Sequence, residues 1–237
     1  LHRLIMTSNT YRQAAAYDPR AARLDPENRL LWRFPRRRME GEAIRDAILQ
    51  VSGLLNPKRG GPSVFPELPE GVETRGGWPV SHDPAERHRR SVYVFVRRNL
   101  RYPLFEAFDF PDTHESCARR NTTVSAPQAM ILLNDRVVLE AAQAFAGRLL
   151  REAGSDPAAQ IERAYRLAYG RRPGADEQQL AQEFLARQAA LIGERLARGE
   201  RVLLPAGMPE GADPARGAAL VDFCHALFNT NEFLTIE

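Results

Sequence analysis

The spacing of apolar residues predicts helices over most of the chain. Within 36–53, apolar side chains recur every three or four positions, which indicates a helix with one buried face that stops at Gly53. After residue 125 the pattern returns between acidic caps and Pro or Gly breaks. The helices predicted there span 126–134, 136–153, 158–170, 175–201 and 216–233. The buried face of the first helix is expected to contain Met39, Ala43, Ile44, Ala47, Ile48 and Val51.

Two segments depart from the helical pattern. Residues Ser91–Val96 are mostly β-branched or aromatic and predict a short strand. Residues 56–86 are rich in Gly and Pro without periodicity, which predicts a long irregular loop. The fold class is therefore expected to be mainly α, an irregular helical bundle with a small β element. We expect residues 1–237 to form a single C-terminal helical domain of a larger protein, with 1–134 and 135–237 as sub-lobes.

Composition and charge narrow the class of protein. The chain has 237 residues, of which 43% are hydrophobic and 27% charged, values that are ordinary for a globular domain. Its net charge is only +3, and its arginines are scattered and balanced by carboxylates, so we expect no nucleic-acid partner. Lys58 is the sole lysine. Nearly all of the positive charge therefore comes from arginine. Either a GC-rich genome or a need for bidentate arginine contacts would explain this preference for arginine over lysine, and we favour the genome. No apolar run is long enough to span a membrane.

The first helix carries more charge on its polar face than a helix needs. Glu42, Arg45 and Asp46 lie there, and the simplest interpretation is a solvated face. The alternative is one buried network that joins these residues to two arginine doublets, which stand beside strongly apolar runs. The doublets are Arg89 with Arg90 and Arg119 with Arg120. Arginine pairs bidentately with carboxylates, so it suits such a network.

Reactive side chains are densest within residues 103–123. They are Asp109, Asp112, His114, Glu115, Cys117, Arg119 and Arg120. Their spacing matches no metal motif, so we predict turns and ion pairs and no metal site. Cys117 is interpreted as a structural thiol, an arginine-activated nucleophile or one half of a disulfide with Cys224. Without a Cys-x-x-Cys-His motif the chain attaches no haem c itself, and we expect no cofactor in it.

Several segments together resemble a known family. In chain order they are LHRLIMTSNTYRQ, DPENRLLWRFPRRRMEGEAIRDAILQVSG, GGPSVFP, RRSVYVFVRRN, FDFPDTHESCARRNTTVSAPQAMILLN, YGRRPGADE and ALFNTNEFL. This order resembles the planctomycete surface-cytochrome C-terminal domain, a domain of unknown function. The family's motif positions correspond here to Arg37, Arg38, Glu42, Arg45, Asp46, Arg89, Arg90, Asp109, Cys117, Arg119, Arg120, Thr122, Thr123, Gln128 and Asn134. The resemblance implies no catalytic residues.

The resemblance implies a cellular context more than a reaction. Such domains follow a companion domain at the C-terminus of large secreted proteins, often with a haem c module upstream. We therefore expect a periplasmic or cell-surface location, and a binding or scaffolding module that docks companion domains or an extracellular polysaccharide. The alternative is an enzyme domain with a polar site around Asp109, Asp112, His114, Cys117, Arg119 and Arg120.

Overall fold

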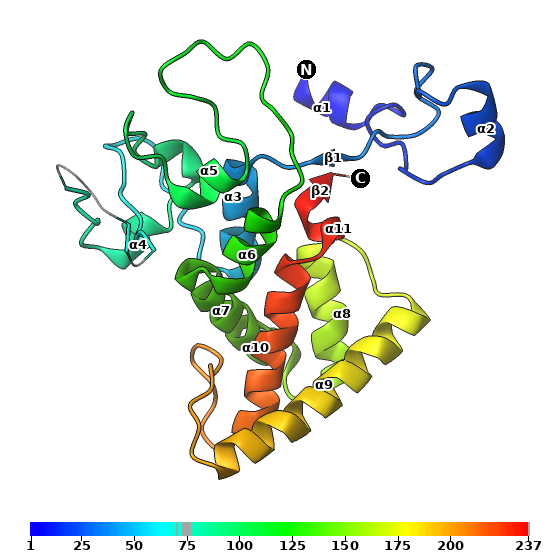
Figure 1. Cartoon of the computed structure of the whole chain (residues 1–237). Helices are drawn as coiled ribbons and strands as arrows, with labels where there is room; N and C mark the ends of the chain where they lie inside the picture. Colours follow the sequence, from blue (N-terminus) through cyan, green and yellow to red (C-terminus); the bar gives the residue numbers. More distant parts are fainter. Residues whose placement is uncertain (70, 73–76, 237) are drawn as a thin grey trace. The chain divides into compact units, whose positions relative to one another are not determined.

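The computed structural model describes residues 1–69, 71–72 and 77–236 (Figure 1). Within them the helices are α1 (His2–Met6), α2 (Pro19–Leu24), α3 (Gly41–Ser52), α4 (Pro84–Arg87), α5 (Pro103–Ala107), α6 (Ala126–Asn134), α7 (Arg136–Ala153), α8 (Pro157–Ala168), α9 (Ala175–Ala197), α10 (Pro214–Phe228) and α11 (Asn231–Leu234). A 3₁₀ helix, η1 (Ser91–Tyr93), and two short strands, β1 (Arg37–Arg38) and β2 (Thr235–Ile236), complete these elements. The mainly α fold class with a small β element is confirmed.

The β element is not where the sequence places it. β1 and β2 form an antiparallel pair, with Arg37 opposite Ile236. The predicted strand Ser91–Val96 is wrong, because this segment begins as η1 and contributes only an isolated bridge between Val94 and Val64. The Ser91 backbone N–H donates to the Asp46 carboxylate over 2.7 Å, so it is not free to pair with another strand. The Asp46 side chain, rather than a β ladder, therefore decides the conformation around Ser91.

The chain divides into two compact units. Unit 1 comprises Leu1–Met39 and Leu234–Glu237, and unit 2 comprises Glu40–Phe233. The expected single C-terminal domain with sub-lobes 1–134 and 135–237 stays a prediction, and the division found here falls at different positions. No helix within the described residues combines the length and the apolar character needed to cross a membrane.

Helix α10 forms the centre of unit 2. It packs against α7, α8 and α9, and Figure 1 shows it running alongside α7. Its buried residues include Leu220, Val221, Phe223 and Leu227. Phe228 stacks on Phe145 of α7 with ring centroids 5.7 Å apart. Asp213 begins α10 as its N-cap, followed by proline at the first helical position, so this helix starts slightly before the predicted residue 216.

Helix α3 is shorter than predicted. It begins at Gly41 rather than near residue 36, because Arg37 and Arg38 pair with β2. Gly53 ends it with φ of 81°, a left-handed conformation that glycine adopts at little cost. The expected buried face is largely correct, since Ile44, Ile48 and Val51 are buried, but Ala43 is exposed. Arg148 of α7 donates to the carbonyl oxygens of Gln50 and Val51 at 3.1 and 2.9 Å, which joins α7 to the end of α3.

The segment 56–86 is irregular, as predicted, apart from α4 at its end. Residues 70 and 73–76 of this predicted loop lie outside the described residues. The remainder is anchored by Trp78, whose Nε1 donates to the Pro66 carbonyl over 2.7 Å and whose ring meets Phe65 edge-on. The loop is therefore attached to a small aromatic cluster of its own.

Candidate functional site

Two arginines are buried completely enough to need an explanation. Arg45 of α3 is 2% exposed and Arg89 is 0% exposed. Arg45 donates to the carbonyl oxygens of Arg87 and Arg89 at 2.5 and 2.9 Å and to Ser91 Oγ at 3.2 Å. Carbonyl groups that lack other partners would be costly to bury. Arg45 therefore fastens the segment that precedes η1 to α3.

Arg89 attaches the loop around Gly60 to the segment that precedes η1. Its guanidinium donates to the carbonyl oxygens of Gly60 and Pro62 and forms an ion pair of 3.3 Å with Glu86. The guanidinium carbon also lies 3.9 Å from the centre of the Tyr93 ring, a cation–π contact. The buried charge is thus shared among one carboxylate, one aromatic face and backbone dipoles.

Asp46, one helical position after Arg45, organises the start of η1. Its Oδ1 accepts hydrogen bonds of 2.7 Å from both the backbone N–H and the side-chain hydroxyl of Ser91. Its other oxygen lies 3.8 Å from Nε of Arg90, while Oδ1 lies 3.9 Å from Arg45. The polar face of α3 is therefore engaged by the chain around residue 90 rather than solvated.

Glu42 has a different partner. Its two carboxylate oxygens accept hydrogen bonds of 2.9 Å each from Nη1 and Nη2 of Arg120, a bidentate pair. Glu40 adds a second carboxylate 3.2 Å from the same guanidinium. The hydrogen bonds to Glu42 raise the pKa of Arg120. This pair joins the start of α3 to the loop before α6.

A hydrogen-bonded chain of side chains fixes the same loop at its base. Asp109, which has a positive φ of 62°, accepts from the backbone N–H and hydroxyl of Thr123 at 2.9 and 2.8 Å. Gln128 donates to the carbonyl of Thr123 over 3.2 Å and completes a capping box with Ser125 at the start of α6. The two ends of the segment 110–124 are thereby held together.

Between these two attachments lies a polar hollow of about 560 Å³. Its lining includes Arg101, Glu106, Asp109, Asp112, Glu115, Cys117, Arg119 and Arg120. Asp112 accepts from the His114 backbone N–H at 2.9 Å, which lowers the pKa of Asp112, and its Oδ1 also lies 3.1 Å from His114 Nδ1. Within the described ranges, no group of three His, Cys, Asp or Glu side chains is placed to hold a metal ion.

The structure brings together only part of the hypothesised network. Glu42 meets Arg120, and Asp46 meets Arg90, whereas Arg45 and Arg89 bond mainly to backbone carbonyls. These are separate contacts rather than one buried network, because the carboxylates and Arg120 keep about a quarter to a third of their side chains exposed. Arg119 is exposed and forms no ion pair with any described residue. Its place in the network was predicted wrongly.

The two cysteines are both free thiols. Cys117 is exposed, and Cys224 is buried in α10, where burial raises the pKa of its thiol. The proposed disulfide alternative between them is therefore wrong. Cys224 occupies the apolar face of its helix, as a structural thiol does.

One polar cluster escaped the residue-level analysis. Arg171 lies between the carboxylates of Glu177 and Glu232, 2.6 Å from each. Its guanidinium carbon also lies 5.4 Å from the centre of the Tyr165 ring. The signal was present in the motif YGRRPGADE, but no spacing rule connects it with a glutamate so far along the chain. The cluster joins the turn after α8 to α11.

This cluster predicts acid sensitivity. Hydrogen bonds from Arg171 lower the pKa of Glu177 from 4.5 to about 2, so the pair stabilises the fold above about pH 4.5 and loses that contribution as the pH falls towards 2. We expect Arg171→Gln to lower the urea midpoint at neutral pH, and this deficit to shrink over that interval. Arg187→Gln, which removes the same charge from an exposed site on α9, is the control. A deficit that does not change with pH would contradict this assignment.

Unit 1 differs from these polar contacts because most of its large apolar side chains are exposed. Among its described residues only Ala15 is buried. Its exposed large apolar side chains on residues 1–31, called here the unit 1 apolar surface, are Leu1, Leu4, Ile5, Met6, Tyr11, Tyr17, Leu24, Leu30 and Leu31. A hollow of about 240 Å³ lies within unit 1, lined in part by Ile5, Tyr11 and Leu31 of this surface. Polar turns hold unit 1 together, for example Trp32 Nε1 donating to the Asp25 carbonyl at 2.8 Å.

The comparisons with known proteins identify a family but no characterised relative. No curated protein and no solved structure matches the chain significantly. One family model matches residues 1–185, which include unit 1 up to Met39, both buried arginines and the polar hollow. That match covers well over half of the chain. The chain belongs to the family PSD1, described as "Protein of unknown function (DUF1553)".

Proposed function

We propose that this domain is a binding and scaffolding module and that unit 1 is its docking element. The observation that carries the proposal is the unit 1 apolar surface, nine exposed large apolar side chains within residues 1–31. Large exposed apolar patches are uncommon on soluble monomers and mark interaction surfaces. Leu1 is 89% and Leu4 73% exposed, so water contacts most of both side chains.

The scarcity of buried side chains in unit 1 supports the same role. A segment of this length with only Ala15 buried among its described residues gains little free energy from hydrophobic burial. The hollow beside Ile5, Tyr11 and Leu31 offers a recess for one partner side chain. Covering this surface with another protein would supply the apolar burial that unit 1 lacks.

The companion domain of the same polypeptide is the partner that we propose. The resemblance to the planctomycete surface-cytochrome C-terminal domain supports this choice. The same resemblance supports a secreted, periplasmic or cell-surface location for the protein. It also supports a haem c group in a module upstream, outside this chain, and an extracellular polysaccharide as a second partner.

The alternative function, an enzyme domain, would use the polar hollow around Asp109, Asp112, His114, Cys117, Arg119 and Arg120. Asp109 and Arg120 already have specific protein partners, Thr123 and Glu42, that fix the loop. The remaining residues lie on an exposed segment, and among the described residues no hydrogen bond joins His114 to Cys117, because the His114 ring contacts Asp112 instead. We therefore favour docking.

Calorimetric titration of the separately produced companion domain tests the proposal. We expect Leu4→Glu, which places a charge on the unit 1 apolar surface, to weaken binding at least roughly tenfold. The matched control is Leu180→Glu on α9, where the wild-type side chain is similarly exposed at 65%. Equal affinities of the wild type and the Leu4 variant, or equal losses in both variants, would refute docking through unit 1.

A further inference from the structure

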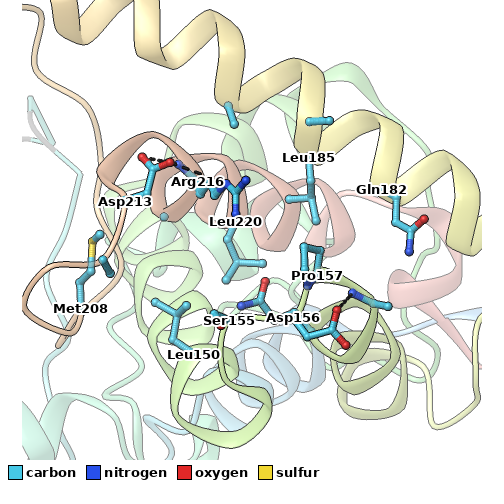
Figure 2. Close-up of a pocket in the computed structure, with 16 residues that line it drawn as sticks. Leu150, Ser155, Asp156, Pro157, Gln182, Leu185, Met208, Asp213, Arg216 and Leu220 are labelled. Atoms are coloured by element: carbon cyan, nitrogen blue, oxygen red, sulfur yellow. Dashed lines mark hydrogen bonds and ion pairs between the residues drawn. The ribbon is translucent and has the colours of Figure 1, made fainter.

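Unit 2 contains an apolar pocket that is distinct from the polar hollow. Its volume is about 430 Å³, within the range of small-molecule sites. It is formed by α8, α9, α10, the end of α7 and the segment before α10. Figure 2 shows Leu185 of α9 and Leu220 of α10 pointing into the space above Pro157. None of its lining residues belongs to the surfaces discussed above.

The pocket wall is mostly aliphatic. Leu150, Leu185, Leu220 and Met208 provide its larger side chains, and small residues of α9 and α10 leave the space between them. Gly217 is one of these small residues, and a Cβ there would lie only 3.1 Å from the Met208 sulfur. The wall therefore suits an apolar molecular body.

One buried polar group interrupts this apolar wall. Gln160 of α8 lines the pocket and is 6% exposed. Its Nε2 donates to the Gly154 carbonyl over 2.5 Å, which fixes the orientation of the amide. Its Oε1 accepts no hydrogen bond from any residue that the structure describes, and this oxygen is not sealed from solvent. An acceptor that lines the pocket without a protein partner is available to a ligand with an N–H or O–H group.

The charges at the pocket margin argue against an anionic ligand. Asp156 and Asp213 each accept hydrogen bonds from the first turns of α8 and α10, so both carboxylates act as helix caps. Arg216, the only cationic side chain among the described lining residues, lies 3.6 Å from Asp213 in an ion pair. An incoming carboxylate would meet two carboxylates and a cation that is already paired.

We propose that this pocket binds a neutral, mainly apolar small molecule that carries one hydrogen-bond donor, of the phenol or alcohol class. The apolar body contacts Leu150, Leu185 and Leu220, and the donor group bonds to Gln160 Oε1. This inference concerns a part of unit 2 that the proposed docking role does not use, so either idea stands or fails without the other.

Three probes that share the naphthalene ring system test the ligand class by calorimetric titration of the whole chain. They are 2-naphthol, naphthalene and 2-naphthoate, which differ in the donor and the charge. We expect 2-naphthol to bind roughly tenfold more tightly than naphthalene, the ratio that one additional hydrogen bond supplies. We expect 2-naphthoate to bind most weakly. The absence of saturable binding by 2-naphthol, or equal affinities for the three probes, would overturn the proposal.

Two variants connect this binding to the pocket. Gln160→Met keeps a similar volume and removes the acceptor, so 2-naphthol affinity should fall to that of naphthalene while naphthalene affinity is retained. Ala186→Phe, at an exposed lining position of α9, should fill the opening and abolish binding of both probes. Ala190→Phe, also exposed on α9 but outside the lining, should bind as the wild type does. Unchanged 2-naphthol affinity in both pocket variants would place the probe elsewhere and refute the site.

Discussion

Gly147→Ala is expected to destabilise the protein by about 3 kcal/mol or more, the upper range for overpacking. Gly147 lies inside α7, where alanine is normally the better helix former. However, a Cβ at this position would lie 2.0 Å from the Ala206 carbonyl oxygen and 3.0 Å from its carbon. Both are backbone atoms, and the Ala206 N–H is held by the Gln143 carbonyl at 2.9 Å, so the segment has little freedom to withdraw.

The same substitution in α9 provides the control. Gly193 also lies inside a helix, and a Cβ there would meet no atom within 4 Å. Gly193→Ala should therefore stabilise the protein by about 0.5–1 kcal/mol through helix propensity and lost backbone entropy. Urea unfolding of both variants measures the two effects. Shifts of the same sign would contradict the close approach of the 206 segment to α7.

Arg45→Met should also cost about 3–5 kcal/mol in the free energy of unfolding, as does the loss of one partner from a buried charged contact. Methionine fills a similar volume but leaves the carbonyls of Arg87 and Arg89 and the Ser91 hydroxyl without the donor they now share. The variant should also release the segment before η1, which amide hydrogen exchange would detect as faster exchange there.

Arg45→Lys distinguishes geometry from charge. A single ammonium on a flexible stem does not reproduce the two guanidinium nitrogens that reach different carbonyls, so lysine should recover less than half of the loss. Arg119→Met, at an exposed arginine with no ion pair to a described residue, should change stability by less than about 0.5 kcal/mol. Full rescue by lysine would show that only the positive charge is needed.

The sequence predicted helices well where caps and periodicity agreed, and less well where a distant partner decided the outcome. Asp135 and Asp156 begin their helices as the pattern indicates. The start of α3 was placed too early because Arg37 and Arg38 are compatible with a helix until β2, almost two hundred positions away, pairs with them. Similarly, Ser91–Val96 has the composition of a strand, but the Asp46 carboxylate takes the N–H with which the segment would start a ladder.

The polar residues were found more easily than their partners. Opposite charges suggest pairs such as Glu42 with Arg120 and Asp46 with Arg90, and the structure brings these together. The partners of Arg45 and Arg89 could not be predicted, because they are backbone carbonyls, which every residue has. The pocket beside Gln160 was missed for a similar reason: its leucines belong to apolar helix faces, and a sequence does not show where such faces fail to close.

The pairing of β1 with β2 has a consequence for biosynthesis. Residues 37–38 are synthesised well before Thr235 and Ile236, with which they pair, and the Met39 N–H also donates to the Leu234 carbonyl at 2.8 Å. Unit 1 therefore cannot assemble fully until unit 2 has been synthesised, whereas the helices of unit 2 can form from nearer neighbours. A chain truncated before β2 would lack this closure, so unit 1 can be complete only once synthesis has passed residue 236.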